Sequence, residues 1–165
     1  MPSGITHARA TIMLATGLAV GAIVTKSPLG YAVGALAGLL ITPDLDIDDG
    51  NISDYFIRRR AGRLAQKLWR GFWWIYATSI NHRSALSHAP FIGTFARLLY
   101  IWCWCAAIIL LIYLVNSNLN LRYFLIESGK IILLNSSLFI GLSAADLLHS
   151  LMDWMIKEKN DGKDI

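Results

Sequence analysis

"LLYIWCWCAAIILLIYLVNSNLN", residues 98–120, lies between Arg97 and Arg122 and contains no charged residue. Its apolar part, Leu98 to Val115, has about the length that a bilayer-spanning helix needs, roughly 20 residues. Apolar residues would surround such a helix on every side, whereas a surface helix of a soluble protein keeps a polar face. The stretch therefore predicts a membrane span. A buried helix of a soluble protein is the alternative.

Three further stretches are apolar but short for a full crossing: residues 11–24, 29–42 and 131–145. The first two are rich in Gly and Ala, and small residues let helices approach closely in a membrane. Gly30, Gly34 and Gly38 recur every four residues and so line one helix face. We expect the first two stretches to form a tight hairpin that turns at Lys26–Pro28, with a buried helix pair in a globular protein as the alternative.

These stretches predict the fold class: an all-α integral membrane helical bundle in one domain, residues 1–165. Its four expected spans are residues 10–25, 29–43, 97–116 and 131–152. Arg9 precedes the first stretch, as a basic residue precedes the core of a signal peptide. A second apolar stretch follows at once without a convincing small-residue cleavage site, so we expect the first to be retained. Cys103 and Cys105 point in different directions on a helix and are expected to be apolar filler.

The basic residues are distributed unevenly along the chain. With four crossings, twelve of the fifteen Lys and Arg residues fall on one side, and the other keeps only Lys26, Arg122 and Lys130. The positive-inside rule then places both termini and the central segment in the cytoplasm, in a multi-pass protein of the inner membrane or another internal membrane. This asymmetry accounts for the basic balance, and no motif that reads DNA or RNA is present, so no nucleic-acid partner is expected.

The central segment, residues 54–78, alternates basic and apolar residues at helical spacing. One expected face carries Phe56, Leu64, Leu68 and Phe72, and another carries Arg59, Arg63, Lys67 and Arg70. With Trp69, Trp73 and Trp74, this is the composition of a basic amphipathic helix that lies in the headgroup layer. Membrane lipid is the expected partner, and each basic group near anionic lipid contributes about 1 kcal/mol. A solvated cationic face without a lipid role is the alternative.

Each of the four histidines lies just outside an expected span: His7, His82, His88 and His149. Acidic residues close the second and fourth spans, in "TPDLDIDD" (residues 42–49) and "DLLHSLMD" (residues 146–153). In a four-span chain, the starts of spans one and three and the ends of spans two and four share one membrane face. The topology therefore predicts that all four histidines and the main acidic clusters meet there.

The spacing of these residues adds detail. His149 and Asp153 are four apart and Asp146 is three before His149, so the three share a helix face. Asp44 and Asp46 would point the same way in an extended segment. Imidazole and carboxylate ligands together suit zinc, manganese, iron or nickel, and facing helices build such sites in bundles. The sequence predicts one or two divalent metal ions, although any one interfacial histidine could instead be merely solvated.

"PDLD", "HRSALSH" and the late His-x-x-x-Asp resemble the YdjM-like predicted membrane-bound metal-dependent hydrolases. They resemble still more a sibling bacterial family of metal-binding proteins, whose initial Ser-Gly-x-x-His element is matched by "SGITH". The resemblance covers nearly the whole chain. Some YdjM-like chains have a histidine directly after the aspartate pair, where this chain has Ile47 and then Asp48. The polar positions that the resemblance implies as metal sites are His7, Asp44, Asp46, His82, His88, His149 and Asp153.

Two kinds of function fit these residues. The first is a metal-dependent hydrolase of phosphorylated or lipid-like substrates at the cytoplasmic face, since a divalent metal lowers the pKa of its water toward ~7. Asp46 or Asp48 would be the general base and Arg83 would pair with a phosphate, while Ser84 and Ser87 orient the histidines. The second is a protein without turnover: a metalloprotein with a structural metal, or an assembly factor that docks through the basic helix and the third span.

Overall fold

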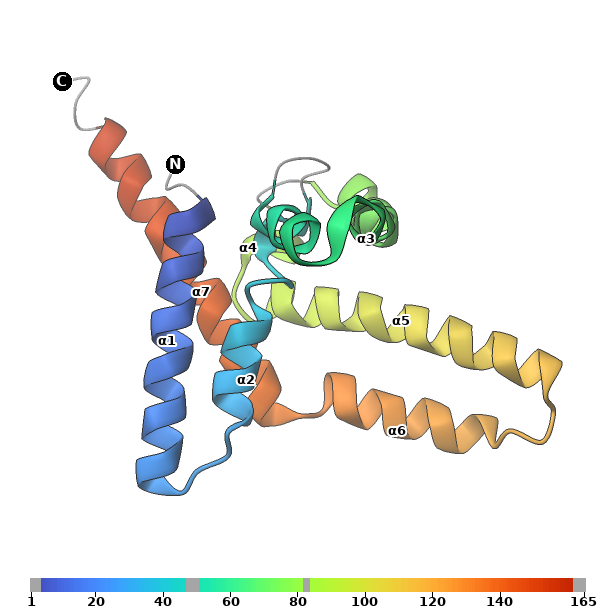
Figure 1. Ribbon diagram of the computed structural model, residues 1–165. Helices are drawn as coiled ribbons and strands as arrows, with labels where there is room; N and C mark the ends of the chain where they lie inside the picture. Colours follow the sequence, from blue (N-terminus) through green and yellow to red (C-terminus); the bar gives the residue numbers. More distant parts are fainter. Residues whose placement is uncertain (1–3, 47–50, 82–83, 162–165) are drawn as a thin grey trace.

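The computed structural model describes residues 4–46, 51–81 and 84–161, and in these ranges the chain is helical without strands. Figure 1 shows the elements in chain order. They are α1 (Gly4–Thr25), α2 (Gly30–Ala37), the 3-10 helix η1 (Pro43–Asp46), α3 (Ile52–Ser79), α4 (Ala85–His88), α5 (Ile92–Val115), α6 (Leu121–Leu133) and α7 (Ser136–Asp161). The all-α prediction is confirmed.

Helices α1, α2 and α7 pack together as one group in Figure 1. The glycine face of α2 turns toward α7. A Cβ at Gly34 would lie 2.2 Å from the Leu138 carbonyl oxygen, and one at Gly141 would lie 2.0 Å from the Tyr31 carbonyl oxygen. Both glycines therefore allow a backbone contact that no other residue permits. The small-residue face of α2 thus serves the contact with α7, in addition to the expected hairpin with α1.

Helices α5 and α6 form a second hairpin, which extends away from the first group (Figure 1). Helix α6 lies outside the predicted spans for most of its length. The expected fourth span, residues 131–152, is interrupted because Asn135 begins a new helix: its side chain accepts a hydrogen bond from the Leu138 amide (3.2 Å). Helices α6 and α7 are bent by 42° at this break.

Within the described ranges, two helices, α1 and α5, are long and apolar enough to cross a membrane, and a third crossing results if the bent pair α6–α7 is one span. Helix α2 has only eight residues. Crossing a bilayer core takes about 20 residues of helix, so the four-span arrangement is unconfirmed, as is the sidedness that depends on it.

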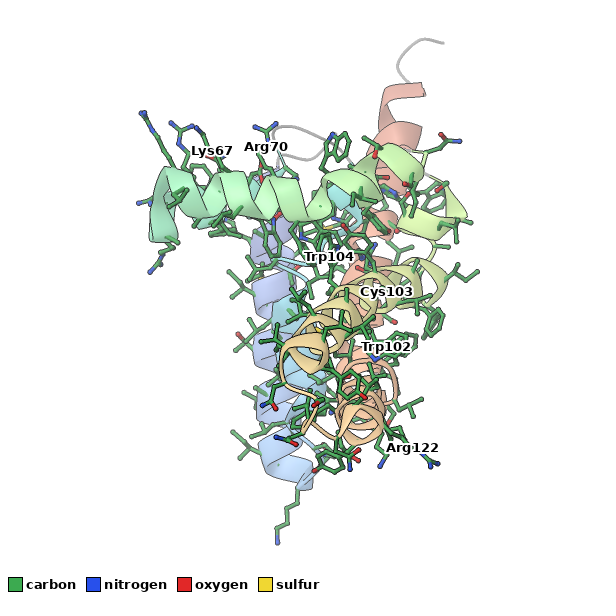
Figure 2. The ribbon with its side chains drawn as sticks, turned by 90° about the vertical axis from the view of Figure 1, so that its right-hand side faces the viewer. Lys67, Arg70, Trp102, Cys103, Trp104 and Arg122 are labelled. Carbon is green, nitrogen blue, oxygen red and sulfur yellow. The ribbon has the colours of Figure 1, made fainter. Side chains whose placement is uncertain are left out.

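Helix α3 crosses above Trp104 of α5 in Figure 2, and α7 extends beyond it. Gly62, at φ 87°, interrupts its helical geometry, and residues other than glycine rarely adopt such a φ. Trp73 and Tyr76 are buried against Leu45 of η1. The Tyr100 hydroxyl of α5 donates a hydrogen bond to the Phe72 carbonyl. These contacts attach α3 and η1 to α5 near Tyr100.

Candidate metal centre

Three imidazoles and two carboxylates meet where α1, η1, α4 and α7 come together. His7 Nε2 is 3.2 Å from Asp153 Oδ1. His149 Nε2 is 3.4 Å from Asp44 Oδ1 and 3.5 Å from Asp153 Oδ2. His88 Nε2 is 3.8 Å from Asp44 Oδ1. The ligand atoms form two triads that share His149, and within each triad all atoms lie within 4.8 Å of one another.

The two separations around His149 suit a shared cation better than direct hydrogen bonds. An N–H···O hydrogen bond in a protein has its most common length near 2.9–3.0 Å. Two ligand atoms bound tetrahedrally to one ion, each at about 2.0–2.1 Å, are about 3.4 Å apart. The nitrogen–oxygen separations around His149, 3.4 and 3.5 Å, match that edge length. The donor set of imidazole and carboxylate groups therefore fits a divalent metal of the zinc, manganese, iron or nickel class.

A short 3-10 helix places the two aspartates of "PDLD". Leu45 is buried against Trp73 and Tyr76 and anchors the turn. Asp44 and Asp46 consequently flank one imidazole, that of His88, rather than lying on one side of an extended strand. Asp44 Oδ1 faces Nε2, and Asp46 Oδ2 lies 3.5 Å from Nδ1. The expectation that both carboxylates point the same way is therefore wrong, because Pro43–Asp46 is a 3-10 helix and not an extended segment.

The His88 ring is held at its Nδ1 side. Ser87 Oγ lies 2.9 Å from Nδ1, and the buried Asp46 carboxylate lies on the same side. The Ser150 hydroxyl also donates to the His88 carbonyl (2.9 Å), which fixes the α4 turn to α7. A metal-binding histidine commonly has its second nitrogen held in this way, because that bond sets the tautomer and the ring direction. Nε2 then points to Asp44 and the shared space.

His7 and His149 stack with their ring centroids 4.0 Å apart and their planes at 23°. Both rings are buried. Two imidazolium cations at this distance would repel each other strongly in a desolvated site. The stacked pair therefore disfavours simultaneous protonation of the two rings, and a neutral ring is the form that binds a metal.

The surroundings of Asp44 lower the pKa of its carboxyl group. Burial opposes its ionisation, but the imidazoles of His149 and His88 outweigh this effect and hold the pKa of Asp44 well below its ordinary value. The side chains of Asp44 and Asp153 remain 23% and 22% exposed, whereas that of Asp46 is fully buried. The cluster is thus open on the side of the two partly exposed carboxylates.

Asp146 does not join this cluster, although its spacing from His149 suggested that it would. It is buried and accepts hydrogen bonds from Arg97 and from the Thr94 hydroxyl. Arg97, also fully buried, donates a second bond to the Ser87 carbonyl (2.7 Å). From the sequence, Arg97 was expected only to mark the start of the third span, residues 97–116. An arginine needs a counter-ion once it is buried, and Asp146, an acidic residue beside another apolar stretch, was the available signal in the sequence.

Six of the seven implied metal positions come together: His7, Asp44, Asp46, His88, His149 and Asp153. Asp46 lies on the far side of His88 from the other carboxylates. His82 lies outside the described residues, as do the proposed catalytic residues Asp48 and Arg83, and Asp49. Cys103 is exposed on α5 and Cys105 is half-buried; neither belongs to a metal-like group in the described part of the chain.

Comparison with known proteins agrees with the chemistry of this cluster. A family model described as "Uncharacterized metal-binding protein (DUF2227)" matches residues 2–162. No curated protein and no solved structure matches the chain. The expected relation to the YdjM-like hydrolases has no support among these matches.

Proposed function

We propose that this chain, which belongs to this family of uncharacterized metal-binding proteins, is a membrane metalloenzyme. Its reaction is hydrolysis of a phosphorylated or lipid-like substrate at the cytoplasmic face of the inner membrane. The observation that carries the proposal is the meeting of His7, His149 and Asp153 with Asp44 and His88 at ligand-like separations. The donor set of imidazoles and carboxylates, with the separations of 3.4 and 3.5 Å around His149, supports a common cation.

Each ring has a defined task in this proposal. His149 Nε2 lies between the carboxylates of Asp44 and Asp153, so it could share an ion with either of them. His7 completes the set on the Asp153 side and His88 completes it on the Asp44 side. Because His149 Nε2 can bind only one ion, a second ion would need ligands other than this nitrogen. One or two ions are therefore possible, and a metal count distinguishes them.

The exposed side of the cluster supports catalysis. A catalytic site keeps one coordination position for water or substrate, whereas a structural zinc site is closed by four protein ligands. When bound there, a divalent ion supplies hydroxide at neutral pH. Asp44 and Asp153 form the exposed side, where a substrate would approach. Asp46 contributes by holding His88, so Asp48 is the better candidate for the general base, and Arg83 for pairing with a phosphate.

A structural metal is the second candidate function. The five side chains come from four elements, α1, η1, α4 and α7, so one ion would tie together segments from both ends of the chain. Metal binding would then be part of the folding free energy. The two functions differ in what a single substitution changes.

The test is a panel of single Asp→Asn variants at Asp44, Asp46, Asp48, Asp49, Asp146 and Asp153, made in the full-length protein in detergent or nanodiscs. Each is scored for metal content, melting temperature and hydrolysis of a generic phosphomonoester and phosphodiester. A catalytic site predicts at least one variant that retains metal and stability but loses turnover. If metal and melting temperature always fall together and the wild type hydrolyses neither substrate, the metal is structural.

A further inference from the structure

The outer side of α3 carries an apolar stripe that nothing in the described chain covers. Leu64, Leu68 and Ile75 are 72%, 67% and 46% exposed. Their spacings of four and seven residues place them on one face of the helix after the Gly62 break. Trp73 and Tyr76 occupy a different face and supply the contact with η1 and α5. The exposed apolar stripe is therefore separate from the face of α3 that packs against η1 and α5.

A cationic stripe lies beside this apolar stripe. Figure 2 shows Lys67 and Arg70 on the side of α3 that faces away from the rest of the protein. Asp54 is the single acidic residue of α3, and it is buried, with its carboxylate 3.6 Å from Arg70 Nε. No other acidic residue of α3 balances the charge of its remaining basic residues. These are all exposed: Arg58, Arg59, Arg60, Arg63 and Lys67.

The position of α3 relative to α5 indicates what covers these stripes. Trp69, Phe72 and Trp73 of α3 form ring contacts with one another, and with Tyr100 and Trp104 of α5. Tryptophan and tyrosine gather at the membrane–water boundary of transmembrane proteins. Helix α5 is the most apolar of the helices that can cross a membrane. The aromatic cluster thus holds α3 alongside Tyr100 and Trp104 of this helix, so α3 lies next to a helix that can cross a membrane.

We propose that α3 is a binding surface for anionic lipid. Leu64, Leu68 and Ile75 reach the boundary between headgroups and acyl chains, and the exposed arginines and Lys67 contact the phosphate groups of the headgroups. An exposed apolar stripe next to a cationic one, with tryptophan beside both, is typical of helices that lie in the interface plane. A soluble acidic partner would account for the cations but would leave the leucines in water. The proposal does not depend on the metal centre.

The first test measures the depth of α3 with spin labels on the full chain in nanodiscs that contain phosphatidylglycerol. In a Cys103→Ala, Cys105→Ala background, one variant carries Leu68→Cys and its matched control carries Lys67→Cys. These adjacent positions face different directions. We expect the label at position 68 to collide more with oxygen than with a water-soluble nickel complex, and the label at position 67 to show the reverse. If both labels are equally accessible to nickel, α3 lies in water and the proposal fails.

The second test measures lipid selectivity by native mass spectrometry in an equimolar mixture of phosphatidylglycerol and phosphatidylcholine. The triple variant Arg60→Gln, Arg63→Gln, Lys67→Gln removes three charges from α3. The control Lys26→Gln, Arg122→Gln, Lys130→Gln removes three charges elsewhere. Each α3 charge removed should lower the preference for the anionic lipid about fivefold. An unchanged preference in the α3 variant, or an equal loss in the control, would overturn the proposal.

Discussion

His7 and His149 stand near opposite ends of the chain, yet their rings stack 4.0 Å apart and share the Asp153 carboxylate. The stack joins the start of α1 to α7. A metal held by the triad of His7, His149 and Asp153 would therefore link the amino-terminal and carboxy-terminal helices. Loss of a metal from this triad should consequently loosen the contact between α1 and α7.

The first prediction concerns these two rings. His7→Ala and His149→Ala should each remove most of the bound metal, and His149→Ala should have the larger effect because His149 belongs to both triads. Metal analysis of the purified protein checks this, with melting temperature measured in parallel. Cys103→Ala and Cys105→Ala serve as controls that should keep the wild-type metal content. Full metal content in His149→Ala would contradict the assignment.

The second prediction concerns the support of His88. Ser87→Ala and Asp46→Asn should weaken metal binding about 10–100-fold without removing a ligand, because they act on the Nδ1 side of the ring. Competition with a metal indicator gives the affinities. Asp44→Asn, on the Nε2 side, should cost more than either. If Asp46→Asn weakens binding as much as Asp44→Asn, Asp46 is itself a ligand.

The third prediction concerns the buried ion pair. Arg97→Met should destabilise the protein by about 3–5 kcal/mol, because it leaves the Asp146 carboxylate buried without its partner. The double variant Arg97→Met, Asp146→Leu should recover much of this loss, since two apolar side chains replace the pair. Denaturant titration in detergent measures the free energies of unfolding. Equal destabilisation in the single and double variants would show that Arg97 acts mainly through its hydrogen bond to Ser87.

The fourth prediction concerns the contact between α2 and α7. Gly34→Ala should destabilise the protein by about 1–3 kcal/mol, because its Cβ would lie 2.2 Å from the Leu138 carbonyl oxygen. Gly17→Ala and Gly21→Ala are matched controls in α1, since a Cβ at either position meets nothing within 4 Å. Both controls should be neutral or slightly stabilising, as expected for alanine in a helix. Thermal unfolding of the three variants distinguishes these effects.

The sequence predicted the features that depend on composition over a long stretch. The charge-free run before Arg122 identified α5, and the basic segment identified α3 within two residues at its start. It did not identify α6, because Arg122, Glu127 and Lys130 interrupt the apolar pattern there. Pairings across the fold were also missed. No local spacing relates Arg97 to Asp146, since the need for a counter-ion arises only when both become buried.

In the candidate site, too, the sequence predicted which residues come together but not how they pair. The convergence of histidines and aspartates followed from counting helix ends, and the structure brings six of these side chains together in its described residues. Their roles could not be assigned from spacing. Asp44 and Asp46 are equivalent in "PDLD" as a sequence, but the turn of η1 places them on opposite nitrogens of His88. That turn depends on Leu45 packing against α3, which is a tertiary contact.

The last prediction concerns the path of the chain through the membrane. Asn118 lies between α5 and α6, and Ile165 follows α7. If α5 and the bent pair α6–α7 each cross the bilayer once, reporters fused near Asn118 and at Ile165 will be on opposite sides. A reporter inserted at Gly62, in the open break of α3, should match Ile165, because α3 precedes α5. The basic residues of α3 predict that this shared side is the cytoplasm.

The measurement uses two reporters, one active only in the cytoplasm and one active only on the opposite side of the membrane, each placed at every position in turn. Matching signals at Asn118 and Ile165 would show that α6–α7 does not cross, and would separate the metal centre from the membrane face proposed for it.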